Sequence, residues 1–146
     1  MKIDFKIEKG KNNDVFNDAI KLRYDIFVVE QECYSVPDQD EIDDYAYHIV
    51  GYNNNEVICC ARVFYKDEIL RWGRIAVKID YRKNNLGLIL LDYLKEFSIN
   101  KMNAKTVNIH AQCYAANFYK KIGFVECGDK FIEDEIEHIE MNLSLI

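Results

Sequence analysis

The sequence predicts one α/β domain of the mixed, α+β kind, with a mostly antiparallel sheet of about seven strands, a central parallel pair and about four flanking helices. The 146 residues suffice for one domain and are tight for two. Apolar residues make up 49% of the chain, which is enough for a core. Their spacing switches between periods of two and of about 3.6 residues, so strands and helices both occur. We therefore treat residues 1–146 as a single domain.

A strand and a helix come first. Apolar and charged residues alternate over residues 2–8, as in a half-buried strand. Asn13 or Asp14 can cap the following helix, which we expect to end at about Val28 or Val29. Its apolar positions recur at helical spacing: Val15, Ala19, Leu22 and Ile26. A long polar loop then runs from Cys33 to Tyr45, and long ordered loops tend to carry function.

The middle of the chain contains three strand-like segments. Residues 47–52 end at the turn signal Asn53-Asn54-Asn55. Residues 57–65 are apolar and β-branched, and a Lys66-Asp67 turn leads to residues 69–79. Connections this short favour antiparallel hairpins.

Helical periodicity begins again after Gly87. The apolar stripe consists of Leu86, Leu90, Leu94 and Phe97. A strand over 106–110, a short helix over 114–122 and two strands, over 124–126 and 136–145, complete the chain. The strand–helix–strand unit from 69 to 110 predicts the central parallel pair.

Composition limits the classes of partner. The formal net charge is −6, which argues against nucleic-acid binding and suits cationic partners such as amines. The first residues alternate between charged and apolar and form no apolar run, so we expect no export signal. The longest apolar stretch, residues 86–91, is too short to span a bilayer. We expect a cytoplasmic protein with no membrane contact, with five reduced cysteines and, because its three histidines are scattered, no metal site.

One loop has the character of an anion site. Arg82 and Lys83 lie between a buried strand and a helix that begins at about Leu86. Helix N-termini present unpaired N–H groups and a positive dipole end, and arginine suits phosphate oxygens. From the residues alone, two interpretations of this loop remain open. It is either a phosphate site or an ordinary strand–helix turn whose charges face solvent.

This loop resembles the pyrophosphate loop of the GNAT superfamily of N-acetyltransferases, Arg/Gln-x-x-Gly-x-Gly/Ala. Arg82 and Gly87 match its first and last positions, and Asn85 replaces its first glycine. Asparagine tolerates positive φ, so the loop geometry can survive this exchange. Residues 110–124 are similar to a second family block, Asn-x-x-Ala-x-x-Phe-Tyr-x-x-x-Gly-Phe. Further blocks between residues 22 and 141 resemble the ElaA-like branch.

The resemblance implies the GNAT fold and an acetyl-CoA-dependent N-acetyltransferase that acts on a primary amine by direct attack on the thioester. The partners are then acetyl-CoA and an amine acceptor, and the protein is a monomer or a homodimer. A non-catalytic sensor or interaction module that binds CoA or acetyl-CoA remains the alternative. The residues implied in cofactor binding are Ile75, Ala76, Val77, Arg82, Lys83, Asn84, Asn85, Leu86, Gly87, Leu88, Gln112, Asn117, Tyr119 and Lys120.

The resemblance also implies catalytic roles. Tyr119 matches the family tyrosine that acts as general acid to the leaving thiolate; a core aromatic is the alternative. Amines with a pKa near ~10.4 are protonated at pH 7, so a base or a water relay is needed. The candidates are Glu30, His48, His110 and His138. We expect Glu30, the acidic loop 38–44, His48 and His138 to converge at the mouth of the cleft, opposite the phosphate loop.

Overall fold

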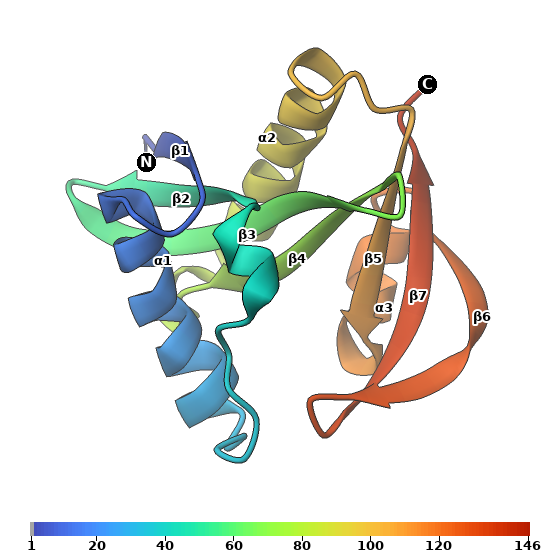
Figure 1. The fold of residues 1–146 in the computed structure, drawn as a ribbon, viewed down its shortest axis with the longest axis horizontal. Helices are drawn as coiled ribbons and strands as arrows, with labels where there is room; N and C mark the ends of the chain where they lie inside the picture. The colour runs from blue at the N-terminus through green and yellow to red at the C-terminus, as the bar shows by residue number, and fades with distance from the viewer. Residues whose placement is uncertain (1) are drawn as a thin grey trace.

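A computed structural model describes residues 2–146 and shows one seven-stranded sheet in the order β1-β2-β3-β4-β5-β7-β6 (Figure 1). The strands are β1 (Asp4–Lys9), β2 (Tyr47–Asn53), β3 (Glu56–Lys66), β4 (Ile69–Val77), β5 (Thr106–Gln112), β6 (Val125–Glu133) and β7 (Ile136–Ser144). The α-helices are α1 (Asp14–Arg23), α2 (Leu86–Asn100) and α3 (Ala116–Lys120). The α/β class with about seven strands is confirmed.

The sheet is antiparallel except between β4 and β5, which confirms the predicted parallel pair. The helix count differs from the expected four or so, because within residues 2–146 three segments are α-helical. Single 3-10 turns form Glu41–Asp44, Ile79–Tyr81 and Cys113–Ala115. The 3-10 turn Cys113–Ala115 replaces the first turn of the helix expected over 114–122.

The first helix changes its winding where it nears the cleft. Asn13 caps α1 as expected, since its side chain accepts a hydrogen bond of 2.7 Å from the Phe16 amide. After Arg23 the chain continues as a π-helix, Tyr24–Glu30, to the end predicted for the helix. Such turns are rare and recur at functional sites. This one carries Glu30 and Gln31 to the wall of the cleft described below.

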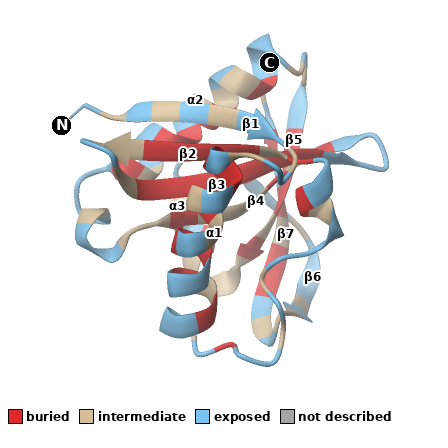
Figure 2. Cartoon of the chain, turned by 60° about the vertical axis from the view of Figure 1, so that its left-hand side comes forward, coloured by how far each residue is buried: buried red, intermediate tan, exposed pale blue. Residues whose placement is uncertain are grey.

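Two apolar layers enclose the sheet. The α2 side chains Leu86, Leu90, Leu91 and Leu94 are fully buried against one face. On the other face α1 packs Val15, Ala19 and Leu22, and the π-helix packs Ile26, against β2, β3 and β4. Strands β2 and β3 between these helices are buried in their middle parts (Figure 2). The helical stripe predicted from Leu86 to Leu94 is therefore a core stripe.

A bulge in β4 opens the sheet. Cys60 pairs with Ala76 and Arg62 with Gly73, so two residues of β4 lie opposite Ala61 alone. Arg74 is one of them and has a φ of 47°, a conformation that is strained in residues other than glycine. A bulge bends its strand, and β4 pairs with β5 only through Arg71 and Trp72. Beyond Trp72 the two strands separate.

The cysteines are free thiols, as expected. Over residues 2–146 the longest helix has neither the length nor the apolar run that a membrane crossing requires.

Candidate active site

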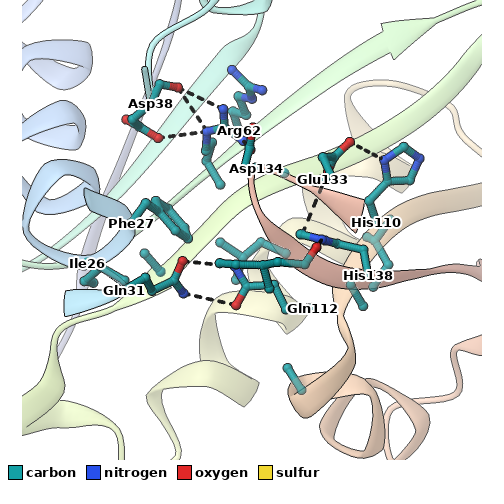
Figure 3. A pocket seen from close by; sticks show the side chains of 18 of the residues that line it. Ile26, Phe27, Gln31, Asp38, Arg62, His110, Gln112, Glu133, Asp134 and His138 are labelled. Carbon is teal, nitrogen blue, oxygen red and sulfur yellow. Dashed lines mark hydrogen bonds and ion pairs between the residues drawn. The ribbon is translucent and has the colours of Figure 1, made fainter. Parts of the chain in front are cut away.

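The separation of β4 and β5 forms the floor of a cleft of about 430 Å³. One wall comes from Ile75, Ala76 and Val77 of β4, and the other from His110, Ala111 and Gln112 of β5. The π-helix, the loop after it and the start of β7 close the remaining sides (Figure 3).

The β4 edge of the cleft carries free main-chain groups. Val77 and Ala76 pair with β3 on their other side, whereas pairing toward β5 ends at Trp72. An unpaired strand edge offers a row of N–H and C=O groups that an extended ligand can join as if it were a strand. The three residues predicted to hold the pantetheine arm therefore lie where such an arm would need them.

One end of this edge leads to the N-terminus of α2. Asn85 has φ 57° and ψ 18°, so asparagine does adopt the left-handed conformation in place of the family glycine. No side chain caps the helix, and its first amides are therefore available to an anion. A Cβ on Gly87 would lie 3.0 Å from the Phe118 ring, which explains why glycine fits here. The loop fits the pyrophosphate that the resemblance implies.

Arg82 is held by a carboxylate in this structure. Its two Nη atoms donate to the two Glu30 oxygens at 2.8 Å each, and its Nε donates to the Val77 carbonyl. The hydrogen bonds to Glu30 raise the pKa of Arg82. The expected position of Glu30, opposite the phosphate loop, is wrong, because the π-helix carries Glu30 to the loop itself.

Replacing Glu30 by glutamine should strengthen CoA binding. The Glu30 carboxylate occupies the donors that Arg82 would offer to a phosphate, and its removal frees them. The expected gain is about two- to five-fold in Kd, the typical contribution of an exposed ion pair. Arg82→Ala should instead weaken binding by about 10–150-fold. Calorimetric titration with CoA measures both.

Glu137→Gln is the control, since it removes an exposed carboxylate that is paired with Lys130 on β6. An equal gain in Glu137→Gln would assign the effect to net charge. Unchanged affinity in Arg82→Ala would remove Arg82 from the phosphate site.

Tyr119 lines the cleft from α3. Its ring makes edge contacts with Phe118 and Phe124, at centroid distances of 5.4 and 5.6 Å. Burial raises the pKa of Tyr119 well above its usual range, so the hydroxyl keeps its proton. A protonated hydroxyl at the wall can donate to a group in the cleft.

The neighbours of Tyr119 are placed differently. Asn117 and Lys120 do not line the cleft, and Lys120 pairs with Glu126 at 2.9 Å. Gln112 does line it, and exchanges two hydrogen bonds with Gln31 across its width (Figure 3). Their side-chain amides join the β5 wall to the end of the π-helix.

A polar group from β5, β6 and β7 lines the cleft. His110 Nδ1 is 3.1 Å from Glu133 Oε1, and His138 Nε2 is 3.8 Å from Glu133 Oε2 (Figure 3). The hydrogen bond with His110 lowers the pKa of Glu133. His138 Nδ1 is 2.7 Å from the Ile136 carbonyl oxygen and must donate to it. Its Nε2 therefore faces the cleft and Glu133.

His48 lies elsewhere. It has no exposed surface, its Nε2 donates to the Asp43 carbonyl at 3.1 Å, and its ring contacts Phe16. Burial lowers the pKa of His48, which keeps the imidazole neutral. The prediction that Glu30 and His48 lie together at the mouth of the cleft is therefore wrong for both residues. His48 lies on β2 beneath α1, and this helix encloses its side chain.

Three aspartates of the acidic loop, Asp38, Asp40 and Asp43, are paired with arginines. Arg23 binds Asp38 at 2.8 Å and Asp43 at 2.9 Å. Arg62 binds Asp40 at 2.7 Å and Asp43 at 2.9 Å. Arg74 binds Asp38 at 2.9 Å. The loop from 38 to 44 thus forms a wall of the cleft rather than a set of free carboxylates.

This network predicts a loss of stability in acid. Burial alone would raise the pKa of Asp43, but hydrogen bonds and charge from Arg23 and Arg62 lower it to about 2. The unfolded chain takes up this proton near pH ~3.9, so the contribution is complete above that pH and disappears as the pH falls toward 2. The expected loss is about 2 kcal/mol, measured by urea unfolding from pH 6 to pH 2.

Asp43→Asn should be less stable at pH 6 and should lose this part of the acid dependence. Asp129→Asn is the control, because Asp129 is exposed on β6 and makes no ion pair within residues 2–146. Identical pH profiles for the wild type and Asp43→Asn would contradict the assignment.

Several residues of the site were not anticipated from the sequence. Arg62, Arg71 and Arg74 lie in strands that read as apolar, and Glu133 lies in a strand predicted to end at 126. Two features of the sequence could have indicated these residues. One is the presence of charged residues inside apolar strands, and the other is the length of the acidic loop.

Comparisons with known proteins identify the family of this chain. Residues 26–145 match the family described as "Acetyltransferase (GNAT) domain". The chain is 37% identical over 131 residues to a UPF0039 protein of Schizosaccharomyces pombe, covering 88% of this chain and 87% of that protein. It is 33% identical over 131 residues to protein ElaA of Escherichia coli, covering 87% and 86%.

Solved structures show the same architecture. The crystal structure of Escherichia coli ElaA aligns with a TM-score of 0.87 and 27% identity, covering 98% of this chain and all of that one. An acyl-CoA N-acyltransferase from Pseudomonas aeruginosa aligns with a TM-score of 0.88 at 21% identity, with the same coverage. Both resemblances noted in the sequence, to the superfamily and to the ElaA-like branch, are confirmed.

Proposed function

Because the chain belongs to the GNAT acetyltransferase family and is an acyltransferase of that type, we propose that it moves an acetyl group from acetyl-CoA to a primary amine. The amine attacks the thioester directly, with no acetyl-enzyme. The observation that carries the proposal is the cleft between β4 and β5, whose lining includes Arg82 from the loop before α2, Tyr119, and the histidines and carboxylate of the β5–β7 side.

The donor side is formed by main-chain groups and Arg82. The residues that would hold CoA are Arg82, the amides that open α2, and the free edge of Ile75, Ala76 and Val77. When bound, acetyl-CoA supplies the activated acetyl group. The Val77 N–H would donate to the acetyl oxygen and stabilise negative charge that develops there. Tyr119 would donate its proton to the leaving sulfur and regain one from solvent.

The acceptor side supplies the base. His110 is poorly suited, because Arg71 Nη1 lies 3.0 Å from His110 Nε2 and arginine can only donate. The His110 Nε2 lone pair is therefore engaged, and its Nδ1–H donates to Glu133. His138 keeps a free lone pair on Nε2 beside the second Glu133 oxygen. We assign His138 as the proton acceptor and Glu133 as the residue that stabilises the imidazolium it becomes.

A turnover assay tests this function. Purified protein is incubated with acetyl-CoA and a panel of primary amines, and free CoA thiol and acetylated amine are both measured. Amine-dependent thiol release, with one acetylated amine per thiol, is the expected result. Tight CoA binding with no amine-dependent release from any class of acceptor would favour the sensor module.

A further inference from the structure

Part of the sheet face on the α1 side carries polar residues in register. Arg71 of β4 is the parallel neighbour of Asn108 on β5. His110 lies opposite Glu140 of β7, and Gln112 lies opposite His138. Because side chains alternate along a strand, these residues share one face. Arg71, His110, Gln112 and His138 all line the cleft, so this face is the floor of its acceptor end.

Four arginines line the cleft, and three of them are neutralised. Arg62, Arg74 and Arg82 each form an ion pair with an aspartate or glutamate of the chain. Within the described part of the chain Arg71 forms no such pair. Among residues 2–146 no carboxylate therefore lies within ion-pair distance of its charge.

The hydrogen bonds of Arg71 are also incomplete. Its Nη1 donates to His110 Nε2 at 3.0 Å, and its Nε is enclosed without an acceptor. Among residues 2–146 no acceptor is bonded to Nη2. The carboxylates of Glu133 and Glu140 lie beside His110, at 3.1 Å from its Nδ1 and 3.9 Å from its Nε2. A guanidinium with free donors and an unpaired charge fits an anionic group on a ligand.

A second cation lies on the same side. Phe64 of β3 pairs with Arg71, and Lys66 is two residues further along β3, hence on the same face. Lys66 is exposed, lines the cleft, and has no ion pair in the described residues. The acceptor end thus has a positive side at Arg71 and Lys66, and a proton-accepting side at Glu133 and His138.

We propose that Arg71 binds a carboxylate of the acceptor, so that the acceptor is a small amino acid and not a simple amine or a polyamine. This rests on the proposed N-acetyltransferase function. The ammonium group lies at Glu133 and His138, and the carboxylate lies at Arg71. A single imidazole ring, that of His110, separates Glu133 from Arg71. A short amino acid spans this separation with one hydrogen bond at each end. A cleft of about 430 Å³ that must also admit the CoA arm favours such a small acceptor.

The activity test uses amines that differ only by a carboxylate: alanine and ethylamine, phenylalanine and phenethylamine, lysine and cadaverine. Rates are compared per unprotonated amine. We expect kcat/KM to favour the amino acid by about 10–150-fold, mainly through KM. Arg71→Gln keeps a donor for His110 and should abolish the preference while leaving CoA affinity unchanged. Arg71→Lys should restore part of it.

Lys66→Gln is the matched control, since it removes a cation from the same face and should retain most of the preference. Equal losses in Lys66→Gln and Arg71→Gln would overturn the assignment to Arg71. Acetylation of both members of each pair at similar rates would also overturn it, while leaving the proposed acetyl transfer intact.

A binding test does not depend on turnover. N-acetylglycine and N-acetylglycinamide are titrated into the wild type and Arg71→Gln, with NMR shifts as the readout. The acid should bind the wild type at least about ten-fold more tightly than the amide, and the variant should not discriminate. If no amine is acetylated but this discrimination holds, the transfer function fails and the anion site stands. Equal affinities for acid and amide in the wild type would overturn the anion site.

Discussion

Replacing Tyr119 by phenylalanine is expected to lower kcat by about 10²–10⁴-fold, the usual contribution of a general acid. Tyr119 lines the cleft, and burial raises the pKa of its hydroxyl, so the proton is available at neutral pH. The edge contacts with Phe118 and Phe124 involve only the ring, which phenylalanine retains. Steady-state kinetics should therefore show a fall in kcat, with CoA affinity and thermal stability close to those of the wild type.

Tyr114→Phe is the matched control, because Tyr114 also lines the cleft but is largely exposed, and its hydroxyl accepts a hydrogen bond from Gln31. Its kcat should change little. Full kcat in Tyr119→Phe would reduce Tyr119 to a packing residue.

Replacing His138 by glutamine is expected to lower kcat/KM by about 10²–10⁴-fold at pH 7. Glutamine can still donate to the Ile136 carbonyl but cannot accept a proton from the amine. The loss should shrink as the pH rises toward the pKa of the amine, because unprotonated acceptor then needs no base. A pH–rate profile from pH 6 to pH 10 measures this recovery.

The other two histidines provide the comparison. His110→Gln should have a smaller effect on kcat/KM, since the His110 lone pair already accepts from Arg71. His48→Gln should lower the melting temperature with little change in the pH–rate profile of the folded protein, because His48 is enclosed beneath α1. A wild-type profile in His138→Gln would exclude His138 as the base.

Periodicity predicted most of the fold because the residues that each element buries recur at regular spacing along the sequence. The stripe from Leu86 to Leu94 and the alternation along β7 both face the core. The π-helix was not predictable from spacing, since its residues continue the apolar pattern of α1. The bulge at Arg74 was equally hidden, because its positive φ depends on ion pairs with a loop more than 30 residues away.

The donor and acceptor sides differ in how far the sequence could describe them. Ile75 to Val77, Arg82 and Asn85 lie in one contiguous segment, so a motif could identify them together. The acceptor side combines Arg71, His110, Glu133 and His138 from four strands. Only the strand register brings these four together. The sequence also gave no sign that Glu30 would bind Arg82, since that contact depends on the winding of the π-helix.

The claim on which the proposed acetyl transfer depends is that the CoA arm lies between β4 and β5. A crystal structure of the protein with CoA tests it directly. We expect the arm along the free edge of Ile75 to Val77, the pyrophosphate at the amides that open α2, and Glu30 displaced from Arg82. A CoA molecule bound elsewhere, with the Glu30–Arg82 pair intact and the cleft free of ligand, would contradict the account.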